Sequence, residues 1–129
     1  MYSWNTVESE IIRIMITRRP ELEGCVPAMG AFHAALVNVY DNKGCLFTCG
    51  NGGSNADALH IVGELCKSFE RKRTLAGDFM ERLTGLPHGE ALVAHLEAGL
   101  PAVALGLNSP LKTAIENDIP VPNIAFAQE

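Results

Sequence analysis

The chain has 129 residues, of which 47% are hydrophobic and 19% charged, and a net charge of -5 at pH 7, as in one ordinary globular domain. Such an acidic chain has too few unopposed cations for general binding to nucleic acid or to an anionic membrane. No stretch approaches the ~20 apolar residues that span a bilayer, no signal peptide is evident, and no CxxC pair occurs, so we expect a cytoplasmic protein without a disulfide framework.

Two amphipathic helices are predicted at the start of the chain. The segment Asn5–Glu8 has the form of a capping box, and apolar residues follow at helical spacing until Pro20. A second helical pattern runs over Val26–Tyr40 and ends at the turn signal of residues 41–44. We expect residues 1–44 to form a helical assembly segment.

The pattern of a parallel α/β unit follows. Cys45–Cys49 is a short apolar run, which predicts a strand covered on both faces of a parallel sheet. A glycine-rich turn leads into a predicted helix that starts within residues 54–56 and reaches Phe69. The run Pro101–Leu107 predicts the second buried strand.

The segment between that helix and the second strand is mixed in character. Residues 70–88 are charged and interrupted by glycine and proline, so we expect a loop or lid with one helical turn around Phe79–Leu83. The basic run at residues 71–73 is predicted to be a solvated helix end. Glu90–Ala98 has the pattern of a further helix.

The last part of the sequence predicts two more helices. Ser109 is expected to be an N-cap, with Pro110 at the first helical position. Residues 124–129 have a helical pattern without a glycine stop or a closing strand. Two strands would leave unpaired sheet edges, so we expect either an incomplete sheet or a second polypeptide that completes it.

The glycine turn is the first chemistry-bearing feature. Gly50, Gly52 and Gly53 would allow positive φ angles and close approach of a ligand, and the following helix presents free N–H groups to an anion such as phosphate. The turn lacks the lysine of a P-loop and the spacing of GxGxxG, so no nucleotide cofactor is expected. The alternative is a purely structural turn between strand and helix.

The second feature is a histidine and a carboxylate on the helix that follows. His60 and Glu64 are spaced i, i+4 and so project from one face of that helix. Such a pair can bind a divalent metal or can provide a general base held by a neighbour. An ordinary surface pair of a helix has the same spacing, and this alternative stays open.

The segment Cys49–Leu65 closely resembles the signature of SIS-domain phosphoheptose isomerases, and the resemblance continues at Leu100–Leu105 and Thr113–Asp118. It implies an α/β fold of SIS type: a doubly wound, flavodoxin-like parallel sheet flanked by helices, here incomplete. Residues 45–129 would be a partial SIS domain, with residues 1–44 as the assembly segment. The family assembles as tetramers, so the resemblance implies a homotetramer or another homo-oligomer that binds a phosphorylated sugar.

The same resemblance implies the roles of individual residues. Glu64 would be the base that interconverts sedoheptulose 7-phosphate and D-glycero-D-manno-heptose 7-phosphate through an enediol, on the route to bacterial surface polysaccharides. His60 and Glu64 would match two ligands of the zinc found in some members. The residues expected to bind substrate are Asn51, Gly52, Gly53, Ser54, Asn55, Asn108 and Ser109. Asn108 departs from the acidic residue of many members.

Two other hypotheses remain at this point. The chain could be a non-catalytic SIS module that binds a sugar phosphate, or an interaction module like the relatives that associate with the bacterial replication initiator DnaA. It could also be one half of a split enzyme, with a second polypeptide supplying the remaining strands. His60 and Glu64 together favour the isomerase.

Overall fold

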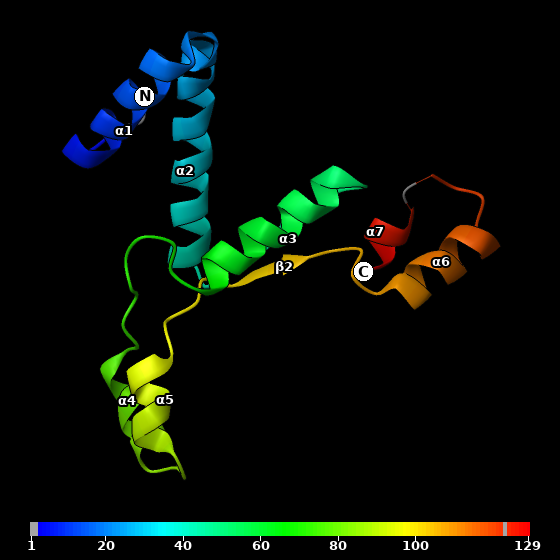
Figure 1. Ribbon diagram of the computed structural model, residues 1–129. Coiled ribbons are helices and arrows are strands. Elements are labelled where there is room, and N and C mark those ends of the chain that lie inside the picture. The colour runs from blue at the N-terminus through cyan, green and yellow to red at the C-terminus, as the bar shows by residue number, and fades with distance from the viewer. Residues whose placement is uncertain (1–2, 123) are drawn as a thin grey trace. The chain divides into compact units, whose positions relative to one another are not determined.

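The computed structural model describes residues 3–122 and 124–129. The chain forms two compact units, Met1–Gly44 and Cys45–Glu129, which are coloured from blue to cyan and from green to red in Figure 1. The first unit is helical, and the second is a mixed α/β unit with a parallel pair of strands.

The predicted N-terminal helices are confirmed. The helix α1 spans Thr6–Arg18. Its capping box is complete, because the Asn5 side chain accepts from the Glu8 N–H at 2.9 Å and the Glu8 carboxylate accepts from the Asn5 N–H at 2.8 Å. A 3₁₀ helix, Pro20–Cys25, was not predicted and leads directly into α2, Val26–Asp41.

The continuous helical run Pro20–Asp41 corrects one expectation. It has 22 residues and, by length and composition alone, could cross a membrane, so the expectation that no apolar stretch approaches this length is wrong. Helices in the cores of soluble proteins and signal sequences pass the same test. Its α-helical part has 16 residues and is about 24 Å long, whereas a hydrocarbon core is about 30 Å thick. Glu21 and Glu23 occupy the 3₁₀ part.

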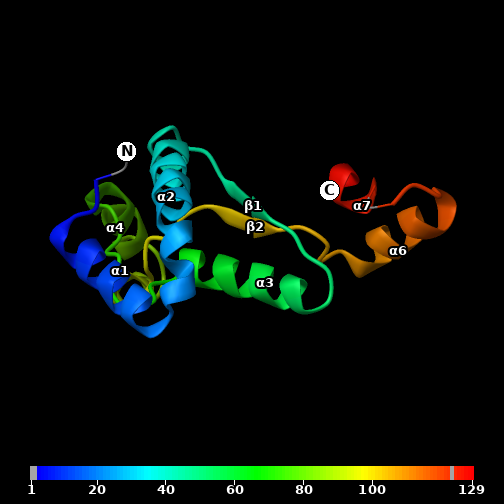
Figure 2. The ribbon, with the colours of Figure 1, turned by 90° about the horizontal axis from the view of Figure 1, so that it is seen from above.

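A short parallel sheet forms the centre of the second unit. Strand β1, Leu46–Thr48, pairs with β2, Ala102–Ala104, and Phe47 lies opposite Val103 in register. Helix α3, Gly53–Cys66, runs along one side of the strands, as Figures 1 and 2 both show. Ala58 in this helix is only 4% exposed, and its carbonyl accepts a hydrogen bond from the Thr48 hydroxyl at 3.2 Å.

The opposite face of the sheet is bare in the described part of the chain. Phe47 is 61% exposed and Val103 is 45% exposed. Side chains alternate between the two faces of a strand, so the set that contacts α3 excludes these two residues. The prediction of strands covered on both faces is therefore wrong for these residues, whereas the parallel α/β pairing is confirmed. The two strands do not by themselves make a doubly wound sheet.

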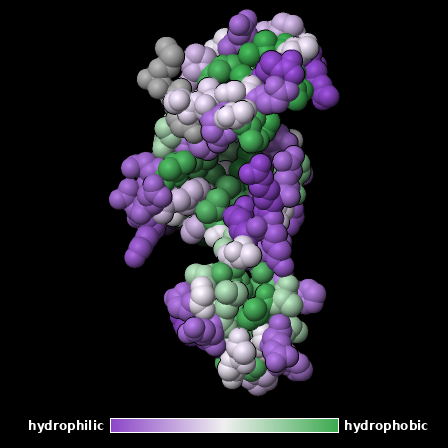
Figure 3. All heavy atoms as spheres, turned by 90° about the vertical axis from the view of Figure 1, so that its left-hand side faces the viewer, coloured by the Kyte–Doolittle hydropathy of each residue, from purple (hydrophilic) through white to green (hydrophobic). Residues whose placement is uncertain are grey.

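The segment between α3 and β2 contains a helical hairpin: its second helix confirms the one predicted at Glu90–Ala98, and its first is longer than the single turn expected around Phe79–Leu83. Helix α4 spans Gly77–Thr84 and α5 spans Gly89–His95, and the two helices contact each other. Gly89 permits this packing, because a Cβ atom there would be 2.0 Å from the Leu83 carbonyl oxygen. Figure 3 shows apolar residues on the surface of this hairpin between polar flanks.

The basic run is also not a solvated helix end. Arg73 donates hydrogen bonds to three main-chain carbonyl groups, those of Leu65, Lys67 and Ala98, at 2.6, 2.8 and 2.7 Å. Lys72 donates to the carbonyl of Ala94 in α5 at 2.9 Å. Helix α3 ends at Cys66, so these cations satisfy carbonyl groups at the ends of two helices. Arg71 and Lys72 remain exposed, and Arg73 is half-buried.

Two helices follow β2. Helix α6 spans Ser109–Asp118, and its N-cap is Asn108, whose Oδ1 accepts from the Leu111 N–H at 3.2 Å. The prediction of Ser109 as N-cap is therefore wrong by one residue: Ser109 is the first helical residue and Pro110 the second, and the Asn108 side chain reaches the third helical N–H. Helix α7 spans Ile124–Gln128, which confirms the helical pattern there.

Candidate functional site

The glycine turn leaves the carboxyl end of β1, and the segment that leads to α6 leaves the same end of β2. Thr48 and Ala104 are opposite each other in register, so residues 49–55 and 105–109 begin at one edge of the parallel sheet. This edge is where open parallel α/β sheets bind their ligands. The structure therefore brings the predicted glycine segment and Asn108–Ser109 to the same end of the sheet.

Two of the three glycines are needed for the shape of the turn. Gly52 has a φ of +54°, which L side chains rarely adopt. At Gly50, a Cβ atom would lie 2.4 Å from both the carbonyl carbon and oxygen of Ser54. Gly53 has neither constraint, because it is already the first residue of α3. The expectation of positive φ is thus confirmed for Gly52 and wrong for Gly50 and Gly53.

The hydroxyl of Ser54 closes the turn. It accepts from the Asn51 N–H at 2.9 Å and donates to the Asn51 carbonyl at 2.7 Å, so its own proton is committed within the turn. In the described residues, the N–H groups of Gly52 and Gly53 donate to no protein group. Main-chain N–H groups at the start of α3, and not the serine hydroxyl, are the donors that the turn offers to an anion.

Asn55 carries an unsatisfied acceptor. Its Oδ1 atom is buried and has no hydrogen-bond partner within residues 3–122 and 124–129. A buried polar atom without a partner costs about 1–3 kcal/mol. Asn55 directly follows Ser54, so the residue that carries this unpaired oxygen lies in the first turn of α3.

Lys112 also belongs to this site, although the sequence analysis missed it. Its ammonium group, on α6, donates to the Asn51 side-chain oxygen at 3.3 Å. It also lies 5.3 Å from the centroid of the Phe126 ring and 3.8 Å from the Glu116 carboxylate. The sequence did contain a signal for Lys112. Helix α6 follows the neighbouring parallel strand, so its first turns lie at the same end of the sheet as the glycine turn.

The predicted His60–Glu64 pair is present on α3. His60 Nε2 and Glu64 Oε1 are 3.5 Å apart. Lys67 Nζ approaches both carboxylate oxygens of Glu64 at 3.1 Å. The Glu64 side chain is 27% exposed and that of His60 is 74% exposed. Glu64 therefore has one partner on α3, His60, and a second, Lys67, directly after the end of the helix.

The structure does not bring this pair to the glycine turn. Ala58 faces the sheet, and at about 100° per residue His60 and Glu64 lie about 200° and 240° around the helix from it. His60 therefore projects from the side of α3 that faces away from the strands, and Glu64 projects from the flank of the helix. The glycine turn and the His60–Glu64 pair are thus two separate parts of the candidate site.

The donors of this pair fit two corners of a metal site. Two ligands of a tetrahedral zinc ion, at bond lengths of about 2.0–2.2 Å, are about 3.3–3.6 Å apart, a range that includes the 3.5 Å observed. No cluster of three or more histidine, cysteine or acidic residues suited to a metal occurs among the described residues. A tetrahedral ion held here would need further ligands from outside this set, such as water or another protein surface.

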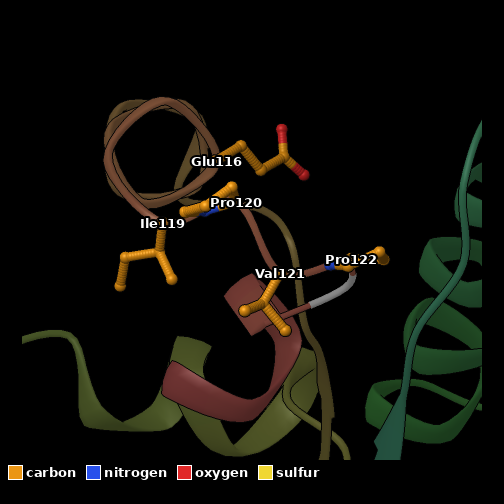
Figure 4. A pocket seen from close by; sticks show the side chains of 5 residues that line it. All are labelled: Glu116, Ile119, Pro120, Val121 and Pro122. Carbon is orange, nitrogen blue, oxygen red and sulfur yellow. The ribbon is translucent and has the colours of Figure 1, made fainter.

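A shallow hollow lies at the other end of α6. It has a volume of about 320 Å³ and is lined by Glu116, Ile119, Pro120, Val121 and Pro122. The Glu116 carboxylate points away from the side chains of Ile119 and Val121 (Figure 4). The hollow therefore presents mainly aliphatic and proline surface and offers no converging polar groups for a sugar phosphate.

Comparison with known proteins indicates the class of protein: the sequence is similar to isomerases of phosphorylated sugars. No protein-family model matches the chain. Two of the relatives are a phosphoheptose isomerase of Roseiflexus sp., 32% identical over 87% of this chain and 45% of the relative, and one of Geotalea daltonii, 33% identical over 79% of this chain and 41% of the relative. A probable phosphoheptose isomerase of Thermoplasma volcanium is 35% identical over 64% and 30%.

The chain spans less than half the length of these curated relatives. This similarity supports the resemblance to phosphoheptose isomerases that the glycine turn and helix α3 carry. It also supports the expectation that the resemblance covers only part of those proteins. It supports an isomerase-like protein of the phosphoheptose isomerase kind.

Proposed function

We propose that the protein is an aldose–ketose isomerase of phosphorylated sugars, with sedoheptulose 7-phosphate and D-glycero-D-manno-heptose 7-phosphate as its substrate and product. The observation that carries the proposal is a glycine turn with free N–H groups beside a helix bearing His60 and Glu64, in a chain similar to phosphoheptose isomerases. A module that only held a phosphate would need the turn but not the carboxylate–imidazole pair.

The turn would bind the phosphate. The N–H groups of Gly52 and Gly53, at the positive end of α3, would donate to phosphate oxygens, because these donors have no partner in the described chain. Asn55 would line the sugar pocket from the first turn of α3. Asn108 and Ser109 would complete the wall on the side of β2, and Ser54 would hold the turn in shape.

Glu64 would move the proton. Its carboxylate would remove a proton from C1 of the ketose, an enediol would form across C1 and C2, and the same proton would return to C2. The proton on O1 would pass to O2 through a second acid–base group. His60 would hold Glu64 in position, or both side chains would hold a zinc ion that polarises the carbonyl group.

The separation of Glu64 from the glycine turn supports a site shared between chains. Glu64 lies on the flank of α3, eleven residues or about 16 Å along the helix from Gly53, so a substrate bound at the turn of the same chain is not the one beside its carboxylate. We propose a homo-oligomer, with a tetramer as the form implied by the resemblance, in the cytoplasm. Each Glu64 would serve a sugar phosphate bound partly by a neighbouring chain.

The test follows conversion of sedoheptulose 7-phosphate by the full gene product and by its Glu64→Gln variant. The amide keeps the shape of the carboxylate but cannot take the proton, so turnover should fall at least about 100-fold, the lower end of the effect of a general base. Glu70→Gln is the matched control, because Glu70 is exposed and follows the same helix. Equal turnover of Glu64→Gln and wild type would refute the role of Glu64.

A second function is favoured by one observation: Glu64 is bound by Lys67 and faces away from the turn. A protein with this arrangement could bind a sugar phosphate without converting it, as a non-catalytic SIS module or as an interaction partner of the DnaA-associating type. Calorimetric binding of sedoheptulose 7-phosphate by the full gene product without any detectable aldose product would support this function over the isomerase.

A further inference from the structure

Lys112 is the side chain that joins α6 to the glycine turn. Its Nζ atom donates to Asn51 Oδ1 at 3.3 Å, across 61 positions in the sequence. The side chain is 27% exposed, so most of its aliphatic stem is packed while its ammonium group reaches the turn. An ammonium carries three donors, and the contact to Asn51 uses one of them.

The surroundings of this ammonium leave it available to an anion. The face of the Phe126 ring lies 5.3 Å away and favours the cation without neutralising it. The Glu116 carboxylate lies 3.8 Å from the Lys112 ammonium group. The Glu116 side chain is 48% exposed, so water weakens this ion pair. The turn itself, residues 49–55, carries no charged side chain. Lys112 therefore brings a positive charge to an otherwise neutral loop.

The contact with Asn51 also fixes an orientation. Lysine can only donate, so the oxygen of the Asn51 amide must face Lys112 and the NH₂ group must point elsewhere. Asn51 is, in addition, the residue that the Ser54 hydroxyl clamps through both main-chain groups. Lys112 thus fixes the side-chain orientation of Asn51, the residue that the Ser54 hydroxyl holds at the start of the turn.

We propose that Lys112 is a phosphate-positioning residue of the sugar-phosphate site. Its ammonium group would bind a phosphate oxygen that the N–H groups of Gly52 and Gly53 also approach, and it would keep Asn51 oriented toward the ligand. This inference rests on the proposed function, and it adds to the site a cation from a helix that the sequence motif does not include. The ligand class is a phosphomonoester, not a neutral sugar.

The experiment measures the dissociation constant of sedoheptulose 7-phosphate by calorimetry for the full gene product and its variants. Lys112→Met keeps the aliphatic stem and removes the charge, and it should weaken binding about tenfold to a hundredfold, as expected for one hydrogen bond to a charged group. Lys112→Arg should retain most of the affinity. Lys43→Met, in an exposed turn, is the control for loss of a lysine charge.

Two further measurements separate positioning from a merely structural role. Raising the salt concentration should weaken phosphate binding less in Lys112→Met than in wild type, because one fewer charge takes part. Glu116→Gln removes the competing carboxylate and should tighten binding severalfold, and it tests the idea even if Lys112→Met does not fold. Circular dichroism checks that each variant is folded.

The outcomes for the two proposals are distinct. The role of Lys112 would be overturned if wild type binds the ligand tightly and Lys112→Met has the same affinity and salt dependence. Weaker binding by Glu116→Gln would overturn it as well. Either result would leave the proposed function standing. If wild type binds neither sedoheptulose 7-phosphate nor D-glycero-D-manno-heptose 7-phosphate, the proposed function fails, and the role of Lys112 fails with it.

Discussion

The ammonium group of Lys67 lies 3.1 Å from both carboxylate oxygens of Glu64. His60 approaches the same carboxylate at 3.5 Å from the preceding turn of α3. Because Lys67 approaches both oxygens, its positive charge opposes the binding of a second cation at the same carboxylate. Lys67 is therefore a local competitor for whatever the His60–Glu64 pair binds.

Removal of this competitor should strengthen metal binding. In Lys67→Met, we expect Zn²⁺ to bind about two- to fivefold more tightly than in wild type, since an exposed ion pair on a helix contributes up to about 1 kcal/mol. The measurement is calorimetric titration with Zn²⁺, with Lys43→Met as the control. Zn²⁺ affinity that is unchanged in Lys67→Met, or equally low in His60→Ala and wild type, would argue against a metal site at this pair.

The close approach at Gly50 predicts a change in ligand binding. A Cβ atom in Gly50→Ala would meet the Ser54 carbonyl group at 2.4 Å, so the turn must move and its N–H groups must leave their present directions. We expect binding of sedoheptulose 7-phosphate to weaken at least about tenfold, the result of losing one good hydrogen bond to a charged ligand.

The matched control for this change is Gly63→Ala, in the helix α3 that follows the turn. A Cβ atom at Gly63 meets nothing within 4 Å, and alanine is the better helix former by about 1 kcal/mol. Gly63→Ala should raise the melting temperature and leave binding as it is. If Gly50→Ala bound the ligand as well as Gly63→Ala does, the shape of the turn would not matter for binding.

The sequence predicted the local elements of this fold better than their long-range partners. The capping box at Asn5 and the glycine turn depend on residues that are neighbours in the chain, so their patterns are visible there. The contact of Lys112 with Asn51 and those of Arg73 with three carbonyl groups depend on how separate segments meet. A basic residue has the same appearance in the sequence whether it is solvated or caps a helix.

The same limit applies to burial and to the site. An apolar run such as Cys45–Cys49 predicts a strand but does not say what covers each face, and Phe47 is exposed in the described chain. The i, i+4 spacing placed His60 and Glu64 on one face correctly. Their position relative to the turn depends on which side of α3 meets the sheet, and Ala58 decides that.

Arg73 should contribute more to stability than its neighbour in the sequence. Arg73→Met removes three hydrogen bonds to carbonyl groups at the end of α3 and before β2, and we expect a loss of about 1.5–3 kcal/mol. This corresponds to a fall in melting temperature of about 5–10 °C for a domain of this size. Arg71→Met is the control, because Arg71 is exposed and should change little. Similar losses in both variants would indicate a general charge effect.

Glu97 should make the stability depend on pH in the acid range. Hydrogen bonding from the Ser68 side chain lowers the pKa of Glu97 from its ordinary value of 4.5, and partial desolvation opposes this shift. The main-chain N–H groups of Ser68 and Arg73 and the charge of Lys72 lower the pKa further. The Ser68 N–H donates to the Glu97 carboxylate at 2.9 Å.

A pKa that is lower in the folded chain gives stability that is complete above the unfolded value and is lost as the pH falls through the folded value. The melting temperature of wild type should therefore exceed that of Glu97→Gln by a constant amount near neutral pH, and this difference should shrink as the pH falls below about 4.5. Glu90→Gln, on the exposed side of α5, should follow wild type throughout. The measurement is thermal unfolding followed by circular dichroism from pH 7 to pH 3. If the difference in melting temperature between wild type and Glu97→Gln stays constant over this range, the Glu97 carboxylate does not link folding to protonation.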